Sequence, residues 1–361
     1  MSKSVFSRGS GLGSRRPVLL GGGLALLAAV LFGVSTPLLQ RLGVGVGSLT
    51  TAALLYAGAA VTGVLLRQPV EREARVRRGD LGPLLAMALS GAVIGPVALA
   101  WGVQHTSATA ASLMLTLEAV FTAVLAWRWY GEAVDRRVLA AMALLTLGAV
   151  ALVLDQADAG RAAGWGLLAV LLATAAWGVD NTVSRRLADR DPGQVVMLKG
   201  LLGATATAGL AVVMGEPVPQ WPTALGLFLV GATGYGLSLR FYLLAQRTFG
   251  AARTGSVFTF APLIGALLAF LMGERGGGVG LGLAVVLMVA GLVLHLAEHH
   301  EHAHVHDPLD HEHAHTHGDG HHLHHHDPMP VGPHSHRHHH APMHHLHPHA
   351  PDEHHQHAHA H

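Results

Sequence analysis

Ten apolar stretches, each about twenty residues long, constrain this chain more than any other feature of its sequence. A helix needs roughly 20 apolar residues to cross the hydrocarbon core of a bilayer. Only 12% of the 361 residues are charged, against about 25% in ordinary soluble domains. The sequence lacks the alternation of apolar and polar residues that is typical of the strands of a membrane β-barrel. The sequence therefore predicts an all-α integral membrane fold with ten transmembrane helices, at residues 17–40, 46–66, 81–103, 107–129, 137–154, 164–184, 194–214, 222–245, 249–272 and 278–297.

The amino terminus carries Arg15 and Arg16 directly before the first apolar run. This pair resembles a twin-arginine export signal, but the run is too long for a cleaved signal and further spans follow. We interpret residues 1–16 as a cytoplasmic segment and the arginines as the anchor of the first span.

Basic residues are concentrated on one side of the predicted spans. With the amino terminus in the cytoplasm, 15 Lys and Arg residues fall on the cytoplasmic side and only three, Arg41, Arg161 and Arg275, on the other. Short cytoplasmic loops of membrane proteins carry this excess of positive charge. We therefore expect a multi-pass protein of a bacterial-type inner membrane, with both termini in the cytoplasm.

The two halves of the chain resemble each other, which predicts five-helix repeats at 17–154 and 164–297. In residues 104–132 and 246–274, Gln104, Thr106 and Glu132 match Gln246, Thr248 and Glu274. Because each half has an odd number of spans, the second half enters the membrane inverted. Inverted repeats are common in secondary transporters, whose substrate site lies between the halves near the midplane.

Several short motifs resemble the drug/metabolite transporter superfamily, EamA type. They are Phe32-Gly33-Val34-Ser35, Trp177-Gly178-Val179, Leu117-Glu118-Ala119-Val120 with Gly131-Glu132, and Gly250 to Gly255 through Ala261-Pro262 to Gly273-Glu274. The resemblance covers about 17–297 and implies ten helices, inverted repeats and transport of small solutes. Many family members have Pro where Ala119 stands, so we expect a straighter fourth span here.

Ionisable residues inside predicted spans are candidates for function, because each is costly in the membrane. Glu118 suits a coupling or cation-binding carboxylate, or a structural ion pair. Asp180 and Lys199 lie at similar depth on spans joined by a short loop, which favours a salt bridge between them. Arg240 and Arg253 either take part in substrate binding or extend to the cytoplasmic surface.

The remaining site candidates are polar or aromatic. Asn181 follows Asp180, and the aromatic candidates Trp101, Trp177 and Tyr235 either line a cavity or belong to the interfacial belts. Pro37, Pro96 and Pro262 interrupt three spans, as hinges or as static kinks.

Residues 298–361 form a tail that holds 28 of the 30 histidines. Its polarity and prolines predict disorder. Alternating imidazoles, with neighbouring carboxylates, suit Zn, Ni or Co. The candidate ligands are His302, His304, His306, His311, His313, His315 and His317.

Three functional hypotheses follow. The chain is a permease, in the exporting direction, for a small organic solute; or a divalent-metal (Zn, Ni, Co) efflux permease; or a metal-sensing or buffering membrane protein. The basic set Lys199, Arg240 and Arg253 disfavours a bare cation in the body, while the tail favours metal. No enzyme activity and no required cofactor are indicated. We expect the lipid bilayer and a small-molecule or metal-ion substrate as partners and no nucleic acid, and we leave a homodimer open.

Overall fold

The computed structural model describes residues 15–69, 72–130, 136–157, 161–249, 251–274, 278–296, 301–306, 309–315, 334–340 and 343–348. Within them, nine helical segments are long and apolar enough to cross a membrane, and each coincides with one of the first nine predicted spans. The tenth predicted span is a shorter apolar helix, α14. The predicted cytoplasmic segment, residues 1–16, lies almost entirely outside the described residues.

The described residues of the first half contain seven α-helices, and two of the spans are built from more than one segment. The elements are α1 (Arg15–Leu42), α2 (Ser48–Leu66), the 3₁₀ turn η1 (Arg78–Asp80), α3 (Leu81–Met87), the π-helical η2 (Ala88–Ile94), α4 (Gly95–Val103), α5 (Ala108–Met114), α6 (Leu117–Tyr130) and α7 (Arg136–Ala157).

The second half repeats this order of long and broken helices. Its elements are α8 (Arg161–Ser184), the 3₁₀ turn η3 (Arg185–Leu187), α9 (Pro192–Val213), α10 (Trp221–Val230), the π-helical η4 (Gly231–Leu237), α11 (Ser238–Phe249), α12 (Ala251–Phe258), α13 (Ala261–Leu271) and α14 (Val279–Leu296).

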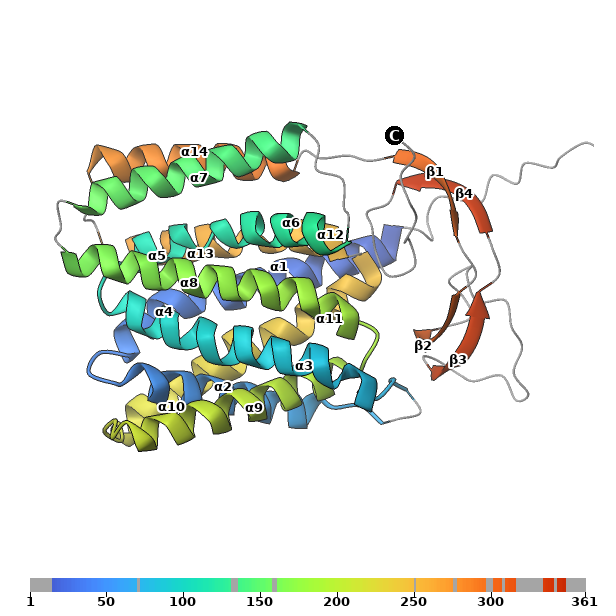
Figure 1. The fold of residues 1–361 in the computed structure, drawn as a ribbon, viewed down its shortest axis with the longest axis horizontal. Helices are drawn as coiled ribbons and strands as arrows, with labels where there is room; N and C mark the ends of the chain where they lie inside the picture. Colours follow the sequence, from blue (N-terminus) through green and yellow to red (C-terminus); the bar gives the residue numbers. More distant parts are fainter. Residues whose placement is uncertain are drawn as a thin grey trace, which may run out of the picture.

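Helix packing crosses between the halves. Helix α2 packs against α9 and η4, α1 packs against α11 and α13, and α7 runs beside α14 (Figure 1). Small residues permit this: a Cβ at Gly200 of α9 would lie 2.7 Å from the backbone nitrogen of Ala60 in α2. Close backbone approach at small residues is the usual packing mode of membrane helices.

The outer surface of the bundle is apolar. Leu65 of α2 is 76% exposed and Val286 of α14 is 65% exposed. Such faces would be unfavourable in water, but they match the acyl chains of a bilayer. The side chains buried inside are mostly Ala, Leu, Val and aromatic residues, with a smaller set of polar groups.

The predicted straight fourth span is wrong. Helix α5 ends at Met114 and α6 begins at Leu117, although no proline is present. The hydroxyl of Thr116 donates to the carbonyl of Leu113 over 2.8 Å, and the Thr116 amide donates to the same carbonyl. This local bonding replaces the regular helical pattern and tightens the backbone into a turn.

The prediction of a wholly disordered tail is also wrong for the described residues. Four strands form there: β1 (Glu301–His306), β2 (Leu309–His315), β3 (His334–His340) and β4 (Met343–Pro348). Strand β1 pairs with β4, and β2 with β3, both antiparallel. Each strand bonds to its partner along one edge, a pairing that the composition alone does not reveal.

Candidate functional site

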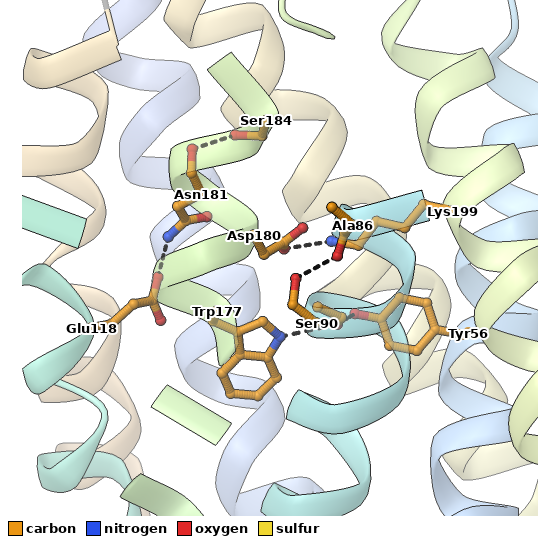
Figure 2. A network of polar contacts seen from close by, with 10 residues as sticks. Tyr56, Ala86, Ser90, Glu118, Trp177, Asp180, Asn181, Ser184 and Lys199 are labelled. Carbon is orange, nitrogen blue, oxygen red and sulfur yellow. Dashed lines mark hydrogen bonds and ion pairs between the residues drawn. The ribbon is translucent and has the colours of Figure 1, made fainter. Parts of the chain in front are cut away.

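A polar network lies inside the bundle, centred on α8. Within little more than one turn, α8 presents Trp177, Asp180 and Asn181 toward the third, seventh and fourth spans, respectively (Figure 2). The surrounding elements are η2, α6 and α9. Three site candidates within five residues of α8 therefore contact three different spans. Helix α8 is thus the element that joins the parts of the site.

Asp180 and Lys199 form the predicted ion pair. Lys199 Nζ donates to Asp180 Oδ2 over 2.5 Å, and the two side chains are only 3% and 7% exposed. The second carboxylate oxygen of Asp180 is buried and has no hydrogen-bond partner among the described residues. The pair therefore offers one unused acceptor inside the membrane, where such an oxygen is costly.

Glu118 is not part of an ion pair within the described residues. Its Oε1 accepts a hydrogen bond from Asn181 Nδ2, so a neutral amide holds the carboxyl group. Glu118 also lies in the first turn of α6, where the positive end of the helix dipole favours a carboxylate. The break at Leu115 and Thr116 creates that helix start in mid-span. Among the residues that the structure describes, no cation forms an ion pair with this carboxyl group.

The backbone carbonyl of Gly91 in η2 accepts hydrogen bonds from side chains of other helices, because Pro96 cannot donate to it. The Gly95 amide donates to Ser90, five residues back, in the π-helical pattern. Continuing that pattern, Gly91 would accept from residue 96, but proline has no N–H. Instead the carbonyl accepts from Trp177 Nε1 over 3.1 Å and from the hydroxyl of Tyr56. Short π-helical segments often occur at functional sites.

An aromatic cluster adjoins this network and draws on both halves. The Phe32 ring lies 5.4 Å from Trp177 and 5.7 Å from Tyr235, edge to face, and Tyr56 lies 5.6 Å from Tyr235 (distances between ring centroids). These rings come from α1, α8, η4 and α2. Trp177 and Tyr235 are buried inside the bundle and therefore do not belong to the interfacial belts, and their lining of a cavity stays a prediction.

The other predicted site residues lie elsewhere. Trp101 is 39% exposed and stacks on His105, which fits the interfacial alternative. Arg240 in α11 is half-buried rather than extended to the surface, and its Nη1 has no hydrogen-bond partner among the described residues. Arg253 lies in α12, and its side chain is outside the described part of the structure.

Ion pairs close the arginine-rich end of the bundle. Arg247 at the end of α11 donates to both carboxylate oxygens of Glu73, at 2.9 and 2.8 Å, and Arg190 donates to Asp80 at 2.8 Å. Burial raises the pKa of Glu73 above its usual value, and the Arg247 charge offsets this only in part. These pairs could not be predicted from sequence, because their partners lie more than a hundred residues apart.

Two glutamates close the opposite end by capping helices of the other half. Glu274 accepts from the amides of Ala108 and Thr109 at the start of α5, at 3.0 and 2.9 Å. Glu216 does the same at the start of α2, from Leu49 and Thr50. The preceding glycines, with φ of +102° and +69°, make the turns that aim these carboxylates.

The predicted metal ligands lie on the tail strands, apart from His317, which is outside the described residues. In the strand register, His302 pairs with His347 and His304 with His345. In the second ribbon, His311 pairs with His338, His313 with His336 and His315 with His334.

Sequence reasoning missed Tyr56 as a site residue. It is a lone hydroxyl-bearing aromatic within an otherwise small and apolar second span. A single tyrosine in this span was the available signal. Its partner, however, is the Gly91 carbonyl, and only the π-helical geometry shows that this carbonyl has no helical hydrogen bond.

Comparisons with known proteins agree on the class of protein. A sequence model of the EamA-like transporter family matches residues 19–154 and again 164–297. A relative from Methanothermobacter thermautotrophicus, described as an uncharacterized transporter, is 29% identical over 233 residues, covering 62% of this chain and 67% of the relative. A solved crystal structure of a protein aligns with a TM-score of 0.54 at 18% identity, covering 78% of this chain and 96% of the other. The last similarity concerns the fold alone.

Proposed function

Because this chain belongs to the EamA-like transporter family, we propose that it exports a small solute across a bacterial-type inner membrane by alternating access. It is a multi-pass membrane transporter and not an enzyme. The observation that carries the proposal is the half-buried contact of Glu118 with Asn181, beside the buried Asp180–Lys199 pair. Ionisable groups inside a membrane bundle mark substrate and ion paths by default.

The proposal assigns the two carboxylates different tasks. Asp180 is compensated by Lys199, which favours a structural and gating role for that pair. Within the described part of the chain, the side chain of Glu118 is held only by the Asn181 amide, so its charge can respond to a proton or to a cationic group of the substrate. Glu118 is therefore the coupling residue in this proposal, and the adjoining aromatic rings contact the apolar part of the solute.

The proposal includes ten spans arranged as two inverted five-helix repeats, 17–154 and 164–297. The twofold family match supports it, and so does reciprocal packing: α1 contacts α11 as α8 contacts α4, and α2 contacts η4 as α9 contacts η2. The inverted arrangement would place the polar network between the halves, where such transporters bind their substrates.

The orientation is testable because the chain has no cysteine. Single cysteines at Val44 and at Arg72 would report opposite faces of the membrane. With both termini in the cytoplasm, a membrane-impermeant maleimide should label Val44→Cys in intact cells and Arg72→Cys only after lysis. The reverse pattern would overturn the proposed orientation.

The transport proposal is tested by growth of expressing cells on a panel of toxic metabolite analogues and drugs. We expect the wild-type chain to raise tolerance to at least one compound and Glu118→Gln to abolish the gain. Asp189→Asn, which removes a carboxylate in the loop before α9, serves as the matched control and should keep it. Wild-type tolerance in Glu118→Gln would refute the role of Glu118.

The histidine tail favours a second candidate, a divalent-metal efflux permease or a metal-buffering membrane protein. The supporting observation is the register that sets His302 opposite His347 and His304 opposite His345, since imidazoles bind Zn, Ni and Co. We propose that the tail binds such metals whichever solute the body carries.

Graded zinc, nickel and cobalt separate these candidates. The variants to compare are the full chain, the chain stopped after Glu298, and Glu118→Gln. Tolerance that is lost with Glu118→Gln indicates metal export by the body. Tolerance that persists in Glu118→Gln but disappears without the tail indicates buffering only. If metal tolerance is the same with all of these variants and without the protein, the metal candidate is rejected.

A further inference from the structure

A pocket lies where α6 and α8 end, away from the central polar network. Its volume is about 460 Å³, and it is lined by Arg128, Trp129, Tyr130, Val183 and Arg186. None of these residues takes part in the contacts of Glu118, Asp180 or Lys199. It lies at the end of the bundle that carries the ion pairs of Arg190 and Arg247.

Two guanidinium groups give the pocket its charge. Arg128 and Arg186 are exposed, and within the part of the chain that the structure describes neither pairs with a carboxylate. The Arg186 guanidinium lies 5.9 Å from the centroid of the Tyr130 ring, a cation–π contact. The Tyr130 hydroxyl donates to the Thr182 carbonyl over 3.1 Å, which fixes the ring. Fixed guanidinium groups are suited to phosphate oxygens.

The walls around these charges are those of a membrane interface. Trp129 and Trp127 of α6 are 50% and 56% exposed, and Val124, one turn further into the span, is 40% exposed. Exposed tryptophans at span ends typically mark the headgroup level of the bilayer. An acyl chain attached to a group in the pocket could therefore run along this face of α6.

We infer that this pocket binds the phosphate of an anionic phospholipid headgroup. Arg128 and Arg186 contact the phosphate, Trp129 lies at the glycerol level, and Val124 contacts the acyl chain. A free phosphorylated solute shares the phosphate chemistry but gains nothing from the exposed apolar face of α6. Basic pockets between helices at the membrane surface bind lipid headgroups in this manner.

Native mass spectrometry of the purified full chain, titrated with phosphatidylglycerol, tests the inference. Arg128→Gln combined with Arg186→Gln should weaken retention of the tightest-bound lipid by about ten- to thirtyfold. The matched double variant Arg72→Gln with Arg75→Gln removes two exposed charges from a loop at the same end and should leave retention unchanged. Equal losses in both double variants, or none in the first, would overturn the inference.

Two further measurements distinguish a loss of lipid binding from misfolding, and a lipid from a soluble ligand. Arg128→Lys with Arg186→Lys keeps the charge but not the two-pronged donor, so it should bind between wild type and the Gln variant. Displacement of phosphatidylglycerol by millimolar inorganic phosphate would assign the pocket to a soluble phosphate compound and refute the lipid. Persistence of the lipid under phosphate supports it.

Discussion

Lys199 of α9 donates to Asp180 of α8, with 2.5 Å between Nζ and Oδ2, and both side chains are buried. A charge in this position is tolerated only with its partner, because an isolated ion in a low-dielectric interior carries a large desolvation cost. The central site therefore depends on a pair whose members must change together.

Replacing Lys199 alone should be severely destabilising. Lys199→Met leaves the Asp180 carboxylate without its cation, and we expect a loss of about 3–5 kcal/mol. Thermal unfolding in detergent, followed by tryptophan fluorescence, measures it. Adding Asp180→Asn should recover most of the loss. A double variant as unstable as the single one would show that the lysine stabilises the fold through packing.

The close approach of η2 to α8 predicts a second effect. A Cβ at Gly91 would lie 2.3 Å from carboxylate atoms of Asp180, so Gly91→Ala should cost about 1–3 kcal/mol through overpacking and displacement of the ion pair. The control is Gly209→Ala in α9, where nothing lies within 4 Å. That change should stabilise by about 0.5–1 kcal/mol. Similar melting temperatures for the two variants would contradict the packing.

The cap at the start of α5 predicts a third effect. Glu274→Ala removes the acceptor of the Ala108 and Thr109 amides, and losing a helix cap costs about 0.5–2 kcal/mol. Glu274→Gln keeps one acceptor oxygen and should lose less. Thermal unfolding of the two variants side by side gives the order, and an equal loss would mean that the carboxylate acts through its charge alone.

Glu73 predicts the sign of a pH effect. Burial raises the pKa of Glu73 in the folded protein, so the folded state holds the proton more tightly than the unfolded state. The stabilisation from this group is complete below the unfolded pKa and is lost as the pH rises through the folded one. Glu73→Gln imitates the protonated form, so its melting temperature should rise relative to wild type as the pH increases. A constant difference across the pH range would contradict the raised pKa.

Sequence and structure agree where local pattern decides the outcome. Apolar length located nine spans, and the similar depth of Asp180 and Lys199 indicated their pairing. The free carbonyl of Gly91 was not predictable, because it needs a π-helical turn and a proline five residues later in the same place. The contact of Glu73 with Arg247 depends on packing between distant segments. The break before Glu118 arises from Thr116, which no sequence pattern singled out.

The two capping glutamates also impose an order in time. The amino end of α2 receives its cap from Glu216, and that of α5 receives its cap from Glu274, each about 165 residues later in the chain. During synthesis both helices enter the membrane before their caps exist. These two helix starts therefore lack their carboxylate acceptors until Glu216 and then Glu274 have been synthesised, so the first half reaches its final stability only together with the second.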